Sequence, residues 1–287
     1  MTDVTGILNV HKATGWTSHD VVAKVRRLAG QKRVGHAGTL DPLAEGVLPI
    51  LLGRATRLAD FVQQGEKTYR AAVALGASTE TDDREGSVSA TAPVPALSAG
   101  RVEEALSAFR GEIMQKPPAY SALKVGGQRA YAVARRGEDV DLAPRPVTIH
   151  ALDLLSLDES SLELEVTCSK GTYIRALARD LAIALGTLGH LSGLVRTRVG
   201  PFRLSDSLTL DAIADRGAAH ALLPASQAIP EAPLFNADAD QTAKLLNGQA
   251  VPVDSLHAQS VWVYDPSGQL VCLASADGSL LRPRLAL

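Results

Sequence analysis

Three runs of alternating apolar and polar residues constrain the fold of this chain more than any other feature. In KTYRAAVALG, residues 67–76, one alternate set starts at Tyr69 and continues through Ala71, Val73 and Leu75. The runs PVTIHALDLL and LELEVTC, which follow later in the chain, show the same period. Because successive side chains of a strand point to opposite faces, the pattern predicts strands with one face toward a core. Tyr69 is expected to point inward.

Other segments have apolar residues at helical spacing. Thr17 and Ser18 can cap a helix that follows the strand-like GILNV and ends at Gly30. A second helix is expected in VEEALSAF, and a third in TYIRALARDLAIALG, whose apolar residues form one face. The run VLPILLG predicts a buried strand, and the acidic segment TETDDREG predicts a turn.

The length of 287 residues exceeds the usual size of a single core, so we expect two domains. The composition, with 46% hydrophobic and 21% charged residues, is that of an ordinary globular protein. It changes near residue 231, where PEAPLFNADAD precedes the short strand patterns VWVYD and LVCLAS. We therefore predict a large domain over residues 1–230 and a small β-rich domain over residues 231–287.

Several classes of protein are disfavoured by what the sequence lacks. No apolar run reaches the roughly 18 residues that a membrane span needs, and no signal peptide is recognisable. The two cysteines, Cys168 and Cys272, are too few for a disulfide framework. The seven histidines are scattered without metal-ligand spacing, and nucleotide-binding and hydrolase motifs are absent. We expect a cytoplasmic protein with no membrane association, metal or cofactor.

The net charge of -2 argues weakly against a nucleic-acid partner, but the charges are segregated along the chain. Basic residues are in excess in residues 1–70, 110–150 and 166–203, and acidic residues are in excess between and after them. If the basic stretches converge on one face, that face could neutralise phosphates. For any single stretch, solvated surface charge is the commoner explanation.

The loop GHAGTLDPLAEG places His36 and Asp41 between buried elements, and catalytic residues concentrate in such loops. Pro42 keeps Asp41 out of the helical region and helps to project its carboxylate. Asp-Pro is also a common turn pair without catalytic meaning, and the pattern alone favours that interpretation. Likewise, a tyrosine such as Tyr69 on a strand usually fills a core.

The segment SKGTYIR is more informative, because an arginine in the first turn of a helix opposes the helix dipole. Arg175 therefore requires either an anionic partner or a path to solvent. A buried carboxylate paired with Arg175 would be held ionised and oriented.

Five segments taken in order resemble the TruB family of tRNA pseudouridine synthases over about residues 6–230. The segments are GHAGTLDPLAEGVLPI, KTYRA, PPAYSALKVGGQRAYAVARRG, CSKGTYIRALARDL and RTRVGPF. The resemblance implies an α+β pseudouridine synthase fold, with a mixed, largely antiparallel sheet, flanking helices and an RNA-binding cleft. It also implies that the C-terminal domain is PUA-like and that residues 117–145 are a thumb-like RNA-binding insertion.

The same resemblance assigns roles to individual residues. Asp41 is the catalytic carboxylate, Tyr69 stacks on the target uracil, and Arg175 pairs with Asp41. The expected substrate-binding residues are His36, Tyr173, Leu194, Lys124 and Arg129. One departure is Lys12-Ala13, where the family usually has Lys-Pro, and it affects local turn geometry rather than catalysis.

The implied activity is isomerisation of uridine to pseudouridine at position 55, in the T-loop of tRNA. It needs no cofactor, and we expect tRNA to be the partner, with no protein partner required. Alternatives that also act on RNA are a guide-dependent dyskerin-like synthase, an RNA glycosidase and a noncatalytic RNA-binding or tRNA-folding protein. The thumb-like segment favours the stand-alone enzyme over the guide-dependent one.

Overall fold

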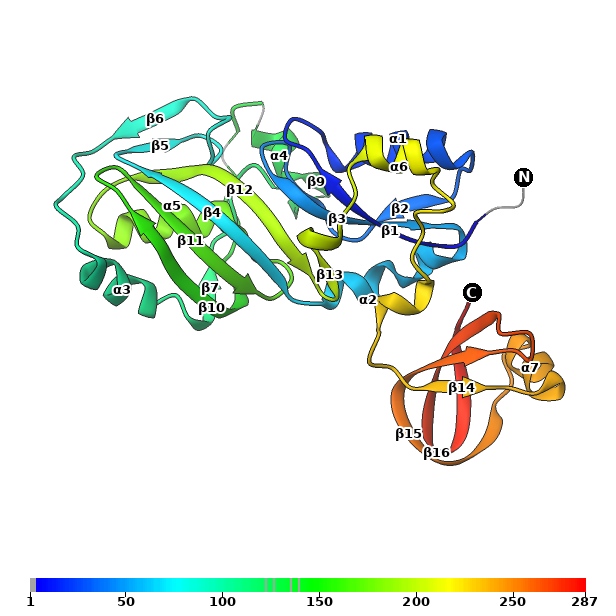
Figure 1. Cartoon of the computed structure of the whole chain (residues 1–287). Coiled ribbons are helices and arrows are strands. Elements are labelled where there is room, and N and C mark those ends of the chain that lie inside the picture. Colours follow the sequence, from blue (N-terminus) through cyan, green and yellow to red (C-terminus); the bar gives the residue numbers. More distant parts are fainter. Residues whose placement is uncertain (1–3, 122, 126, 135, 139) are drawn as a thin grey trace.

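A nine-stranded mixed sheet organises the larger part of the molecule in a computed structural model, which describes residues 4–287 except 122, 126, 135 and 139 (Figure 1). Its main path runs in the order β1-β3-β12-β4-β11-β10-β7, with β2 paired to β3 and β13 paired to β12. The strands are β1 (Gly6–Lys12), β2 (Val34–His36), β3 (Glu45–Leu52), β4 (Lys67–Leu75), β7 (Gly111–Gln115), β10 (Arg145–Leu157), β11 (Ser161–Cys168), β12 (Gly189–Val199) and β13 (Phe202–Arg203).

All pairings in this sheet are antiparallel except the short parallel contact between β3 and β12. That contact pairs Val195 with Glu45 and Arg196 with Gly46. A Cβ atom at Gly46, where φ is 107°, would lie 2.3 Å from the carbonyl oxygen of Arg196. Glycine thus permits the close approach that joins the two halves of the sheet.

Four helices cover one face of the sheet and enclose the main core. They are α1 (Ser18–Ala29), α3 (Ala99–Ser107), α5 (Ile174–Ala184) and α6 (Leu210–Arg216). The inward set of β4, from Tyr69 to Leu75, belongs to this core, which confirms the predicted strand and its register. The predicted largely antiparallel α+β fold is also confirmed.

The predicted helix ends agree with the structure where capping signals were clear. Thr17 caps α1 by accepting a hydrogen bond from the Asp20 amide, and Gly30 ends it in the left-handed conformation. The strand expected in VLPILLG is β3, and the turn expected in TETDDREG connects β5 (Ala77–Thr79) to β6 (Val88–Thr91).

The predicted thumb-like segment contains a two-stranded hairpin and one short helix. These are β8 (Lys124–Val125), β9 (Gln128–Arg129) and α4 (Ala130–Ala134).

The C-terminal domain has its own small core beneath a three-stranded sheet. Its elements are β14 (Leu234–Asn236), α7 (Ala239–Leu246), β15 (Val251–Tyr264) and β16 (Leu270–Ala286). It packs against the larger part of the molecule beside η1 (Gly53–Leu58), α2 (Ala59–Gln64) and η3 (Ala225–Ala228) (Figure 1). Trp262 donates a hydrogen bond from Nε1 to the carbonyl oxygen of Ile229 at 2.9 Å.

Candidate active site

A cleft of about 680 Å³ opens where the β2–β3 loop faces β4, β12 and the start of α5. Its lining includes five of the predicted site residues, Asp41, Tyr69, Tyr173, Arg175 and Leu194. These residues are separated by up to 153 positions in the chain, so the cleft exists only in the folded sheet. The sequence segments that carried the family resemblance therefore converge at one place.

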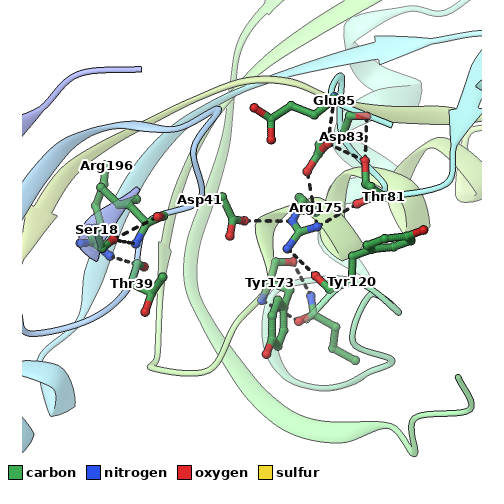
Figure 2. A network of polar contacts seen from close by, with 12 residues as sticks. Ser18, Thr39, Asp41, Thr81, Asp83, Glu85, Tyr120, Tyr173, Arg175 and Arg196 are labelled. Atoms are coloured by element: carbon green, nitrogen blue, oxygen red, sulfur yellow. Dashed lines mark hydrogen bonds and ion pairs between the residues drawn. The ribbon is translucent and has the colours of Figure 1, made fainter. Parts of the chain in front are cut away.

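Arg175 is the centre of the polar network in this cleft (Figure 2). Its Nε lies 3.0 Å from Asp41 Oδ2, and its Nη1 lies 3.4 Å from Asp83 Oδ2. It also donates hydrogen bonds to the carbonyl oxygens of Thr81 at 2.9 Å and Tyr120 at 3.0 Å. The guanidinium is only 8% exposed, so these contacts replace the hydration that burial removes. The anionic partner expected for a first-turn arginine is present.

Asp41 remains 39% exposed to the cleft while its loop is fixed from behind. Ser18 at the start of α1 exchanges two hydrogen bonds with the backbone of Leu40, at 3.1 and 2.9 Å. Arg196 donates to the carbonyl oxygens of Gly38 and Thr39. The Asp41 carboxylate is thus both oriented by the protein and open to a ligand.

Lys12 fixes the other side of the same loop. Its side chain is fully buried, and Nζ donates to the carbonyl oxygens of Trp16 at 2.7 Å and Ala13 at 3.1 Å, with a longer contact to Pro42 at 3.5 Å. Burial lowers the pKa of Lys12 to about 8, although the nearby Asp41 charge opposes that shift. The turn that follows Lys12 therefore closes without the family's usual proline.

Tyr69 and Arg196 form a second buried pair on adjacent strands, where β4 and β12 place them opposite each other. Arg196 is 2% exposed and donates from Nε to the carbonyl oxygen of Val47 at 2.8 Å. Burial raises the pKa of the Tyr69 phenol, while the positive charge of Arg196 opposes the rise. A tyrosine with a raised pKa stays protonated at neutral pH and can donate a hydrogen bond.

Tyr173 and Leu194 lie on the wall of the cleft, as the resemblance implied. The backbone of Tyr173 exchanges hydrogen bonds with the side-chain amide of Gln115, at 2.8 and 3.1 Å. Burial raises the pKa of the Tyr173 phenol. Together with Tyr69, these side chains give the cleft an aromatic and apolar lining suited to a flat base.

His36 lies outside the set of described residues that line this cleft. It ends β2 and makes an edge-on contact with His19, with ring centroids 5.6 Å apart. Its Nδ1 is buried without a hydrogen-bond partner in the described structure. Burial lowers the pKa of His36, and the charges of His19 and Arg196 act in the same direction. The predicted contact of His36 with substrate remains a prediction.

The backbones of Lys124 and Arg129 pair in the β8–β9 hairpin, but their side chains lie outside the described residues. Arg136 in the same segment is exposed, and it contacts Glu138 and Gln128. In the described part of the chain, no group of histidine, cysteine, aspartate and glutamate is arranged to hold a metal. No helix in that same part is long and apolar enough to cross a membrane.

Sequence reasoning missed two residues that organise the cleft. Asp83 lies in the segment predicted only as an acidic turn, yet its side chain is 4% exposed and pairs with Arg175. Arg196 lies within an alternating strand and was not singled out. The only sequence signal was an arginine at an inward strand position, which requires buried acceptors.

Comparison with known proteins decides the family. The TruB family pseudouridylate synthase N-terminal domain matches residues 26–174, and the tRNA pseudouridylate synthase B C-terminal domain matches residues 175–228. The chain belongs to the TruB family. This membership confirms the resemblance drawn from the sequence motifs, and the chain is therefore a pseudouridine synthase, an isomerase.

Relatives that align with this chain over nearly their whole length support the same family. The chain is 43% identical to the tRNA pseudouridine synthase B of Arthrobacter sp. (strain FB24), covering 98% of this chain and 96% of that protein. It is 42% identical to the protein of the same name from Caldanaerobacter subterraneus subsp. tengcongensis, covering 98% of both. The second matched segment, residues 175–228, lies within and just after the large sheet rather than in the domain formed by β14–β16.

Solved structures confirm the fold of this TruB protein. A chain in the crystal structure of a Cbf5-Nop10-Gar1 complex matches with a TM-score of 0.74 and 25% identity, over 98% of this chain and 84% of that chain. A chain in an H/ACA ribonucleoprotein bound to a substrate RNA containing 2'-deoxyuridine matches with a TM-score of 0.73 and 22% identity, over 98% and 84%. At that identity, the second likeness concerns the fold alone.

Proposed function

We propose that this protein isomerises the uridine at position 55, in the T-loop of tRNA, to pseudouridine, with Asp41 as the catalytic carboxylate. The observation that carries the proposal is the ion pair between Arg175 and Asp41 in a cleft that also contains Tyr69. The relatives that align over nearly the whole chain are named tRNA pseudouridine synthase B, which supports tRNA as the substrate.

The reaction breaks the N1–C1′ bond of the nucleotide and joins C5 to C1′, while C5 loses a proton and N1 gains one. No electrons are exchanged. Asp41 is exposed enough to meet a ribose, and Arg175 orients it, so the carboxylate can act as a nucleophile at C1′ or as a base on the ribose. Tyr69 stacks on the uracil, and its hydroxyl oxygen accepts the C5 proton while it passes its own proton to water.

The target uridine must leave the stacked loop before it can enter the cleft. Extrusion costs a few kcal/mol, and aromatic stacking offsets about 1 to 3 kcal/mol per base. Tyr69 and Tyr173 supply aromatic surfaces in the lining of the cleft. Phosphate contacts from the basic segments offset the rest of the cost of extrusion.

The deciding experiment incubates the purified protein with unmodified tRNA and with a tRNA whose position 55 is cytidine, without metal or cofactor. Pseudouridine is expected only in the first RNA, and only at position 55. Mass spectrometry separates isomerisation, which leaves the RNA mass unchanged, from base loss by a glycosidase, which lowers it. Binding without product, or a requirement for a guide RNA, would overturn the proposal.

We further propose that residues 117–145 act as a thumb that binds RNA phosphates through Lys124 and Arg129. The same proposal includes a domain boundary between residues 230 and 231, a cytoplasmic location and activity without a protein partner. Replacing Lys124 and Arg129 together by alanine should weaken tRNA binding and flatten its salt dependence, because fewer counterions are released. An unchanged salt slope would remove these residues from the RNA contact.

A further inference from the structure

Arg175 and Arg179 lie one turn apart on the same face of α5 and make matching sets of contacts. Arg175 binds the Asp83 carboxylate and the carbonyl oxygen of Tyr120. Arg179 binds the Asp82 carboxylate and the carbonyl oxygen of Lys116. Each guanidinium therefore connects the helix both to the β5–β6 turn and to the chain that leads into the thumb-like segment.

Arg179 is the more remote of the two and does not belong to the set of described residues that line the cleft. Its Nη1 lies 2.7 Å from Asp82 Oδ2, and its Nη2 donates to the Lys116 carbonyl oxygen at 2.9 Å. Asp180 occupies its Nε at 2.8 Å. The Arg179 and Asp82 side chains are 22% and 14% exposed, so the pair is largely shielded from solvent.

The backbone at Asp82 shows what this pair accomplishes. Its φ is 60°, in the left-handed region that residues other than glycine, asparagine and aspartate rarely occupy. Neighbouring side chains of an extended chain point to opposite sides, whereas here Asp82 and Asp83 both reach arginines on one helix face. The left-handed turn and the Arg179 contact together present Asp83 to Arg175.

We infer that Arg179 is a positioning residue for pseudouridine formation. It acts by holding Asp82, and thereby sets the Asp83 carboxylate against the guanidinium that orients Asp41. The Lys116 contact gives Arg179 a second route to the cleft, through the segment that carries Tyr120 and Ser121. The inference rests on the proposed role of Asp41 and Arg175.

The test compares Arg179→Gln and Asp82→Asn with the unaltered protein in single-turnover assays on tRNA at saturating enzyme. Asn tolerates the left-handed conformation, so Asp82→Asn removes the ion pair and spares the backbone. We expect both variants to react roughly tenfold more slowly with an unchanged Kd for tRNA, because a small misplacement of reacting groups slows the chemical step. Arg179→Lys, which keeps the charge, should recover part of the rate.

A matched control is Arg110→Gln. Arg110 also joins a carboxylate, Glu103 at 2.6 Å, to a backbone carbonyl, that of Leu152. It lies outside the set of described residues that line the cleft, so its replacement should leave the rate unchanged. A general loss of rigidity would slow both variants alike and would overturn the inference.

A double-mutant cycle that combines Arg179→Gln with Arg175→Lys distinguishes action through Arg175 from a general structural role. If Arg179 acts through Arg175, adding Arg179→Gln to Arg175→Lys should slow the reaction by much less than tenfold. The inference would be contradicted if the rate effects of the two substitutions multiplied in the double variant. It would also be contradicted if Arg179→Gln lowered Tm but left the rate of the folded protein unchanged. If the unaltered protein is inactive, the proposed function is overturned as well. If the unaltered protein is active and Arg179→Gln is fully active too, only this inference is overturned.

Discussion

The ion pairs of the cleft and those of the C-terminal domain use the same chemical groups in opposite environments. Arg175 and Asp83 are 8% and 4% exposed, and the pair also makes hydrogen bonds to the surrounding backbone. Arg282 and Asp277 in the C-terminal domain are each 51% exposed. An arginine paired with an aspartate therefore has two different functions in one chain.

The difference follows from solvation. Water and salt screen an exposed pair, so its contribution to stability is small. Removing one partner of a buried pair leaves an uncompensated charge, which costs about 3 to 5 kcal/mol. The buried pair of the cleft carries this cost and orients the Asp41 carboxylate through Arg175, whereas the exposed Arg282–Asp277 pair contributes little to the stability of its domain.

The largest effect should come from removing the Asp41 carboxylate, which is exposed to the cleft and paired with Arg175. Asp41→Asn preserves the size of the side chain and much of its hydrogen bonding but removes the charge. It should bind tRNA normally and give no measurable pseudouridine in single-turnover assays. Appreciable product would make Asp41 a turn residue before Pro42, and Glu45 in the same loop would become the candidate.

Changing the shape of the cation while keeping its charge should have a smaller effect. Arg175→Lys loses the planar fork that contacts Asp41, Asp83 and two backbone carbonyls. Turnover should fall by roughly ten- to a hundredfold without being abolished, because the positive charge remains while the carboxylate is oriented less well. A lysine variant with the full rate would show that charge alone is sufficient.

Tyr69→Phe sharpens the comparison by removing a buried hydroxyl while leaving every ion pair of the cleft in place. The aromatic ring remains, so tRNA affinity should persist while turnover drops. Tyr69→Leu should reduce both, because stacking is lost as well. Full turnover of the phenylalanine variant, measured beside the leucine variant, would exclude the hydroxyl from the reaction.

A pH effect on stability should distinguish the catalytic domain from the C-terminal domain. Burial lowers the pKa of His36 below its ordinary value, so below about pH 6.5 the unfolded chain binds a proton that the folded protein does not. The free energy of unfolding should therefore fall as the pH drops from about 6.5 toward the lowered pKa of folded His36. Urea unfolding at pH 7.5 and 5.5 should show a larger decrease for the unaltered protein than for His36→Gln.

The smallest effect is expected in the exposed half of the comparison. Asp277→Asn breaks the contact with Arg282 at the surface of the C-terminal domain, and it should change neither Tm nor turnover measurably. A clear loss of stability would mean that exposure does not govern the value of these pairs, and the contrast between the two regions would fail.

The parts of the fold that were predictable have local causes. The ends of α1 follow from capping residues, and the register of β4 follows from its alternation. The C-terminal strands were predicted too short, because outside VWVYD and LVCLAS the strands β15 and β16 are polar and interrupted by register shifts. Where backbone hydrogen bonds hold two strands together, the side chains need not alternate between apolar and polar, so the sequence does not show the full length of the strands.

The candidate site was predictable only in part, for a related reason. Arg175 stood out because its helix position is electrostatically unfavourable, but its second carboxylate did not. Asp83 is separated from Arg175 by 92 residues, and nothing in TETDDREG distinguishes the buried Asp83 from the exposed Glu80 and Glu85. Burial of that charge is a property of the assembled sheet and helix.

The seam at Gly46 has a consequence for how activity develops as the chain folds. Asp41 comes from the half of the sheet formed by β1–β3, and Arg175 comes from the half that contains β4 and β11, with β12 joining the two. Docking the two halves closes the long stretch of chain between Asp41 and Arg175 into a loop, which is an entropically costly step of folding. Local helices and hairpins can form before this step, but the ion pair between Arg175 and Asp41 cannot. Recovery of catalysis during refolding should therefore lag behind recovery of secondary structure, so that enzymatic activity reports the docking of the two halves.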